Sequence, residues 1–169
     1  MEEKVIKRLN KLKKISVIKD YTIGGAHALA YYLEPVKTLD FDIFILIESD
    51  QDFYNFRNYI KKSGFKVSGT HVVIDYTPVH FLPGSMSPFI NEAIRKSKRI
   101  RIGGVPSKVL SIEYLIVSLL FSFRLKDRMV IPDLLELADK TKLQDIIERY
   151  SDEEAPLDKR LQRILESIS

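Results

Sequence analysis

Apolar and polar residues alternate along the chain with two periods, which separate the expected helices from the expected strands. Residues 2–17 carry apolar side chains at helical spacing with lysines between them, which predicts an amphipathic helix packed on the domain. Short apolar runs at 21–23 and 40–47 predict strands, and the second is apolar on both faces, as in a covered central strand. The Ala-rich segment 25–33 predicts a helix close to the sheet, which Pro35 ends.

The middle of the chain mixes short strands with two more helices. Ser49 favours a helix start and predicts a helix over 50–63, and Ser87 does the same for a helix over 88–96. The strands expected in this region are Val67, 72–76, 79–82, 99–102 and 105–110, with a tight turn at Thr77-Pro78 in the second hairpin.

Beyond residue 110 the pattern is helical only. The expected helices run from Ser111 to Phe123, from Ile131 or Pro132 to Asp139, from Thr141 onward, and over 157–168, with a charged junction at 124–128 and a polar linker at 151–156. The chain therefore predicts an α+β fold, with a mixed β-sheet flanked by helices over residues 1–110 and a C-terminal helical region over 111–169. We expect the two parts to pack as a single compact unit.

Two carboxylates stand one residue apart at the start of the second expected strand. Asp40 and Asp42 share a face of that strand, because side chains at i and i+2 point the same way. Two carboxylates this close repel each other unless a cation lies between them. Mg²⁺ suits this position because it prefers oxygen ligands and leaves room for phosphates. The pair therefore predicts a site for Mg²⁺, or for Mn²⁺ in its place.

A Gly-Gly turn stands between the first strand and the Ala-rich helix. Gly24 and Gly25 leave backbone N–H groups bare directly before a helix N-terminus, where an anion such as a phosphate can approach. His27 follows this turn, and it either reaches that phosphate or packs against the domain. The histidines at 27, 71 and 80 do not have the spacing of a zinc site.

Composition and charge narrow the class of protein. The 169 residues include no cysteine, which excludes disulfides, thiolate metal sites and a cysteine nucleophile. The N-terminal segment is charged, and the most apolar run, 112–123, is too short to span a bilayer, so we expect a cytoplasmic protein without a membrane partner. The net charge of +4 permits a nucleotide or nucleic-acid partner. The lysines and arginines of the chain concentrate in three runs: Lys11 to Lys14, Arg95 to Arg101 and Arg124 to Arg128. Each run is either a solvated face or a phosphate-binding surface.

The order strand, Gly24-Gly25, helix and strand with Asp40-Phe41-Asp42 resembles the nucleotidyltransferase superfamily, which has the polymerase-beta-like fold. Within it the chain looks similar to small AbiEii-type and related prokaryotic members, over roughly residues 15–139. Two later segments, Val109 to Leu115 and Arg124 to Asp127, also resemble motifs of these relatives. The resemblance implies that Lys126 faces the cleft and that Asp127 orients it.

Two positions depart from the pattern of these relatives. The relatives have a third carboxylate on a strand beside the aspartate pair, at the position where this chain has His80. Histidine acts as a base or as a metal ligand, although it is a poor ligand for Mg²⁺, or it is a half-buried strand residue without a role. Asp75 is a possible alternative third ligand, or a turn residue that caps its own backbone. Relatives also carry an arginine where this chain has Val36, whereas Thr38 remains.

The resemblance implies a metal-dependent nucleotidyltransferase that moves an NMP from an NTP to a hydroxyl of an RNA end, a protein or a small molecule. AbiEii-type relatives act in toxin–antitoxin pairs, so that role is implied by resemblance alone. The alternative is a catalytically impaired module that binds nucleotide or nucleic acid, since His80 replaces the third carboxylate; a subunit that needs a partner chain is a third reading. The implied roles are catalytic for Asp40, Asp42 and His80, metal-binding for Asp40 and Asp42, and nucleotide-binding for Gly24, Gly25, Thr38 and Lys126.

Overall fold

The computed structural model describes residues 2–34, 40–68 and 71–168. Its strands are β1 (Tyr21–Gly24), β2 (Phe41–Ile45), β3 (Lys66–Ser68), β4 (His71–Ile74), β5 (Thr77–Pro83), β6 (Lys98–Ile102) and β7 (Val105–Val109). Its helices are α1 (Glu2–Lys14), α2 (Gly25–Tyr32), α3 (Asp50–Lys62), α4 (Pro88–Arg95), α5 (Ile112–Ser122), α6 (Leu125–Leu135), α7 (Lys140–Tyr150) and α8 (Leu157–Ser167). Within these ranges no helix has the length and apolar character needed to cross a membrane.

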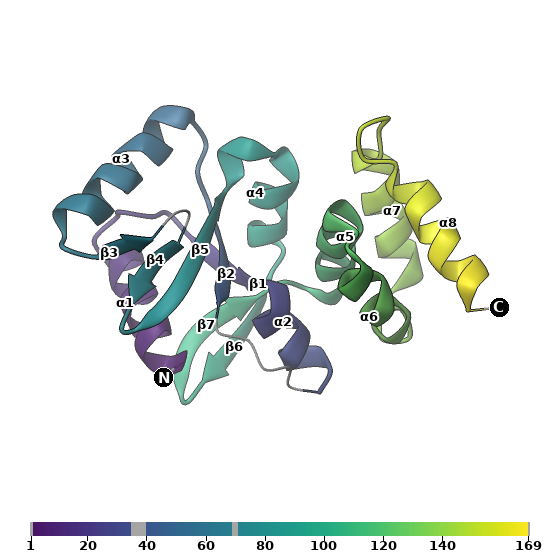
Figure 1. Cartoon of the computed structure of the whole chain (residues 1–169), viewed down its shortest axis with the longest axis horizontal. Helices are drawn as coiled ribbons and strands as arrows, with labels where there is room; N and C mark the ends of the chain where they lie inside the picture. The colour runs from purple at the N-terminus through teal and green to yellow at the C-terminus, as the bar shows by residue number, and fades with distance from the viewer. Residues whose placement is uncertain (1, 35–39, 69–70, 169) are drawn as a thin grey trace.

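The strands of the described residues form one mixed sheet in the order β3-β4-β5-β2-β1-β7-β6 (Figure 1). β2 lies at its centre, antiparallel to β1 and parallel to β5. Its side chains Phe41, Ile43 and Ile45 on one face and Phe44 on the other are buried, as expected for a strand covered on both faces. The predicted mixed sheet with flanking helices and a helical C-terminal portion is confirmed.

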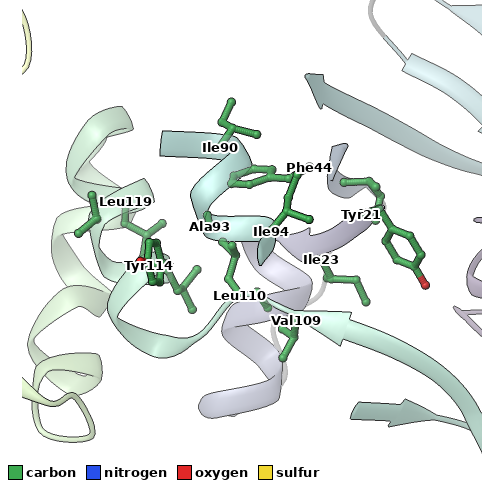
Figure 2. Close-up of a cluster of buried hydrophobic side chains, with 14 of the residues drawn as sticks. Tyr21, Ile23, Phe44, Ile90, Ala93, Ile94, Val109, Leu110, Tyr114 and Leu119 are labelled. Atoms are coloured by element: carbon green, nitrogen blue, oxygen red, sulfur yellow. The ribbon is translucent and has the colours of Figure 1, made fainter. Parts of the chain in front are cut away.

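Helices cover both faces of the sheet. On one face Phe56 of α3 packs edge-on against Phe81 of β5, with ring centroids 5.0 Å apart. On the other face α4 covers Phe44 of β2, and Figure 2 shows Ile90 and Ile94 of this helix in the same buried cluster. This apolar contact holds β2 rigidly between two layers of helices, and the start of β2 carries the aspartate pair.

The helices α5 to α8 gather on one side of the sheet, and α4 lies between them and the strands (Figure 1). Phe89 of α4 packs against three aromatic rings of this C-terminal region. The ring centroids of Tyr114, Phe121 and Tyr150 lie 5.9, 5.1 and 5.4 Å from that of Phe89. The contact between α4, which covers the sheet, and the last helices is therefore an aromatic core.

Glu92 of α4 adds a polar contact at the same boundary. Its carboxylate accepts hydrogen bonds from both terminal nitrogens of Arg149, at 2.6 and 2.8 Å. The hydroxyls of Tyr114 and Tyr150 also donate to it, at 2.7 and 2.9 Å. The Arg149 guanidinium, with these hydroxyls, lowers the pKa of Glu92 from its ordinary value of 4.5 to about 2.

The β4–β5 hairpin turns earlier than predicted. Asp75 and Tyr76 form the turn, with φ angles of 47° and 66°, and β5 begins at Thr77. Two left-handed residues make the short turn whose twist matches the flanking strands, and aspartate tolerates that conformation better than most residues. Pro78 therefore lies inside β5, opposite Val73, and the prediction of a turn at Thr77-Pro78 was wrong.

Most of the charged junction at 124–128 is also helical, and only residues 123–124 separate α5 from α6. α6 begins at Leu125, and Asp127 caps its start by accepting a hydrogen bond from the Arg124 N–H at 2.9 Å. Pro132, which predicted a helix start, lies inside α6. The sequence rule that favours proline at the first turn of a helix therefore placed this start about two turns too late.

Candidate functional site

The end of β1 and the start of β2 bring the Gly-Gly turn against the aspartate pair. Gly24 lies opposite Asp42 in the antiparallel register. Gly25 has a φ of 57°, and a Cβ atom at this position would collide with the Asp42 carboxylate. Glycine is thus required at position 25 both for its backbone conformation and for the space that Asp42 occupies. The bare backbone at the start of α2 and a carboxylate group lie in direct contact.

β5 places an imidazole beside the same carboxylate. His80 lies next to Asp42 in the parallel register of β5 and β2. The Nδ1 atom of His80 is 3.4 Å from Oδ1 of Asp42, and each side chain is about one-third exposed, at 35% and 36%. His80 therefore faces the aspartate pair from the neighbouring strand, whereas its catalytic role stays a prediction.

A second histidine completes this arrangement. His71 of β4 lies opposite His80, with ring centroids 5.3 Å apart, and its Nε2 atom is 3.5 Å from Oδ2 of Asp40. Each aspartate of the pair thus faces one imidazole. Sequence reasoning missed His71 because it placed the hairpin turn two residues too late. A turn at Asp75 and Tyr76 pairs His71 with His80, so a correct prediction of the turn would have indicated His71 as a residue of the site.

His27 packs close to the pair. Its ring stacks on Phe41 with centroids 3.6 Å apart and planes 7° from parallel. Its Nδ1 atom is 3.2 Å from Glu2 of α1. Burial lowers the pKa of His27, although the charge of Glu2 opposes that shift. Of the two possibilities that the sequence left open, the described residues show the packing one.

The donor atoms at this end of the sheet fit a divalent ion held by two carboxylates. Mg²⁺ is commonly bound through one or two carboxylates, with waters and substrate phosphates as its other ligands. Asp40 and Asp42 offer the two carboxylates. The imidazoles of His71 and His80 suit Mg²⁺ less well. In the described part of the chain, no group of three or more acidic or histidine side chains is arranged to hold a metal ion.

Three other predicted residues lie elsewhere. Asp75 is in the hairpin turn, 3.9 Å from Arg8 of α1, and so it faces α1. Lys126 is exposed on the first turn of α6. Asp127 is 3% exposed and bonds to the start of its own helix, which corrects the expectation that it orients Lys126. Thr38 lies outside the described residues.

Comparison with known proteins supports the fold. No family model matches the chain, and no curated protein matches it in sequence. Among solved structures it is similar to an antigenic nucleotidyltransferase-like protein from Paracoccidioides brasiliensis, with 16% identity and a TM-score of 0.63. The match covers 96% of this chain and 86% of that chain. At this identity the likeness shows the fold alone, and the fold of this chain is nucleotidyltransferase-like.

Proposed function

We propose that this protein is a metal-dependent nucleotidyltransferase, which moves a nucleoside monophosphate from an NTP to the hydroxyl of an acceptor. The contact between Gly25 and the Asp42 carboxylate carries this proposal. Backbone donors at the start of α2 suit the phosphates of an NTP, and the adjacent carboxylates suit the cation that accompanies them. The fold agrees with this chemistry, since a structure that it resembles is described as nucleotidyltransferase-like.

Each residue at the site has a role in this proposal. Asp40 and Asp42 hold Mg²⁺ or Mn²⁺, and when bound the ion offsets the negative charge of the triphosphate. Gly24 and Gly25 place backbone N–H groups near the phosphates. The acceptor hydroxyl oxygen forms the new bond to the α-phosphorus, and pyrophosphate leaves with the electrons of the broken bond.

His80 is the proposed base for the acceptor hydroxyl. In this proposal the Nδ1 atom, which lies 3.4 Å from Oδ1 of Asp42, carries the proton, and Nε2 accepts the proton of the hydroxyl. A carboxylate that holds one ring nitrogen of a histidine fixes the tautomer in which the other nitrogen is basic. His71 contacts the second aspartate and is proposed to hold Asp40 in place.

The acceptor is an RNA end, a protein side chain or a small molecule. A more specific proposal is that the protein is the toxin of a toxin–antitoxin pair, as AbiEii-type enzymes are. It predicts that expression of the wild-type chain slows cell growth and that the Asp42→Asn variant does not. Equal growth of cells that express either chain would reject the toxin role and leave the transfer reaction to be tested directly.

A catalytically impaired module that binds nucleotide is the second candidate, and one observation favours it. His80 occupies the position beside Asp42 where a third carboxylate would strengthen the hold on a second metal ion. Such a module binds Mg²⁺ and nucleotide through the two aspartates but transfers nothing. The two candidates therefore agree on binding and differ in turnover.

Thermal stability with each NTP, with and without Mg²⁺, tests both candidates. A nucleotide at 100 times its Kd adds about 2.7 kcal/mol to the stability of the folded state, which is readily measured. We expect a Mg²⁺-dependent gain that Asp42→Asn abolishes. Asp133→Asn, on an exposed position of α6, is the matched control and keeps it.

Transfer of label from an α-phosphate-labelled NTP then separates the candidates. Labelled acceptor in a Mg²⁺-dependent reaction supports the enzyme, whereas binding without transfer to RNA, protein or small hydroxyl compounds supports the module. The absence of any nucleotide-dependent gain in stability would reject both.

A further inference from the structure

A polar hollow of about 560 Å³ opens between α1 and the β6–β7 hairpin, away from the aspartate pair. It joins two of the basic runs that are distant in sequence, the one in α1 and the one that leads into β6. The described residues that line it include one carboxylate, Asp20, and four cations: Lys13, Arg99, Arg101 and Lys108. These four cations are called the basic surface below.

The floor of the hollow is a fixed network of hydrogen-bonding groups. The hydroxyl of Tyr21, a residue that is only 2% exposed, lies 2.8 Å from Oδ1 of Asn10 and 3.0 Å from Oγ of Ser107. Asn10 in turn donates to the carbonyl of Pro106 at 2.8 Å. β1, α1 and the β6–β7 hairpin are thereby tied together, so the elements that carry the cations are held in fixed positions relative to one another.

The positive charge of the hollow is only partly balanced. Oδ1 of Asp20 accepts hydrogen bonds from Lys13 at 3.1 Å and from the Tyr21 backbone N–H at 2.9 Å, and Oδ2 accepts one from Lys108 at 2.5 Å. Arg99 and Arg101 are exposed, and neither forms an ion pair within the described part of the chain. The Arg99 guanidinium, and the nitrogens of Arg101 other than Nη1, which donates to the Gly104 carbonyl at 2.7 Å, are therefore available to an external anion. Guanidinium matches phosphate geometry well.

The cations continue along β6 toward the candidate site. β6 is an edge strand of the sheet. Lys98 at its start lies 5.2 Å from the ring centroid of Tyr31 in α2, and this ring is 45% exposed. Lys98 pairs with Val109 of β7, and Val109 also pairs with Ile23 of β1, the residue before Gly24. An exposed aromatic ring beside a cation is the combination that binds a base together with its backbone.

We propose that the basic surface binds the phosphate backbone of a single-stranded nucleic acid, with Tyr31 as a stacking position for a base. A membrane surface fits less well, because the hollow is concave and a flat layer of headgroups does not follow its shape. The binding does not depend on the transfer reaction proposed above, because it involves neither Asp40 nor Asp42.

Fluorescence anisotropy of a labelled single-stranded RNA of about 12 nucleotides, titrated at several salt concentrations, tests the proposal. Counterion release makes log Kd depend linearly on log salt, by about 0.7 per phosphate contact on a single strand. The double variant Arg99→Ala/Arg101→Ala should therefore lose about 1.4 from that slope and bind at least roughly tenfold more weakly at 0.1 M salt. Tyr31→Ala should weaken binding without changing the slope.

Lys61→Ala/Lys62→Ala is the matched control, because it removes two exposed cations from α3 and changes the net charge equally. It should bind as the wild type does. Equal losses in both double variants would reject a specific surface, as would vesicles of anionic lipid that bind the chain more tightly than RNA. Single-stranded DNA in place of RNA shows whether the sugar contributes. Asp42→Asn should leave RNA binding unchanged, so a failure of the nucleotide site is distinguished from a failure of this surface.

Discussion

At position 25 the backbone and a neighbouring side chain both exclude a Cβ atom. Gly25→Ala should therefore destabilise the protein beyond the cost of a left-handed residue, which is about 1–2 kcal/mol. Gly64→Ala is the matched control, because Gly64 has a φ of 81° and nothing lies within 4 Å of its Cβ position. Urea unfolding gives both losses of free energy.

The collision in Gly25→Ala involves the Asp42 carboxylate, so removal of that carboxylate should relieve it. We expect Gly25→Ala/Asp42→Ala to be more stable than the sum of the two single changes predicts, because the two positions are in contact. Losses that simply add would show that the turn and the carboxylate are not in contact in solution.

His80 decides how well the site holds a metal ion. His80→Asp adds a third carboxylate beside Asp42, so it should lower stability without metal through repulsion and raise the gain in melting temperature that Mg²⁺ produces. His80→Asn removes the imidazole without adding charge, and it should show neither effect. Differential scanning fluorimetry with and without Mg²⁺ measures both. An unchanged response to Mg²⁺ in His80→Asp would separate His80 from the metal position.

At the scale of elements, the hydrogen bonds between α4 and α7 depend on the charge of Glu92. Its pKa is about 2 in the folded protein and 4.5 ordinarily, so the unfolded chain takes up the proton first as the pH falls. The contribution of Glu92 is complete above about pH 4.5 and is lost progressively toward pH 2.

Glu92→Gln should accordingly cost about 1 kcal/mol at pH 7 and lose less stability than the wild type between pH 4.5 and 2. Urea unfolding at several pH values measures this difference. Glu153→Gln, at an exposed position between α7 and α8, is the control and should follow the wild type. Parallel pH curves for wild type and Glu92→Gln would show that Glu92 does not stabilise the contact.

Most elements were predictable from local pattern, and the failures share a cause. β2 and α1 can be predicted without tertiary information, because the continuous apolar run of β2 and the helical spacing of apolar residues in α1 are visible in the sequence. The turn at Asp75 and the early start of α6 depend on a left-handed backbone and on a side-chain cap, which compete with stronger proline signals at 78 and 132. One misplaced turn then concealed His71.

The whole molecule depends on the contact that α4 and the segment after β7 make with the last helices. Phe89, Ile90 and Leu110 are buried there, and each such side chain contributes about 1.5–3 kcal/mol when fully buried. A fragment of residues 1–110 should thus unfold at a lower temperature than the full chain, as circular dichroism would show. A fragment with an unchanged melting temperature would contradict the expectation of a single compact unit.

Prediction of the candidate site had a limit at this scale. The glycine turn follows β1 and the aspartate pair begins β2, so the spacing of these motifs in the sequence was enough to predict that they meet. The basic runs of α1 and β6 meet only because β7 lies between β1 and β6 in the sheet. No local pattern encodes that neighbourhood, and the sequence showed only the two runs separately.

The parallel register of Asp42 and His80 also has a genetic consequence. The codons of histidine and aspartate differ only in their first base, so a single base substitution in the gene places a carboxylate on β5 beside Asp42. No change in strand pairing or chain length is needed for this step. A library of single-base variants selected for Mg²⁺-dependent activity therefore contains the three-carboxylate form from the start.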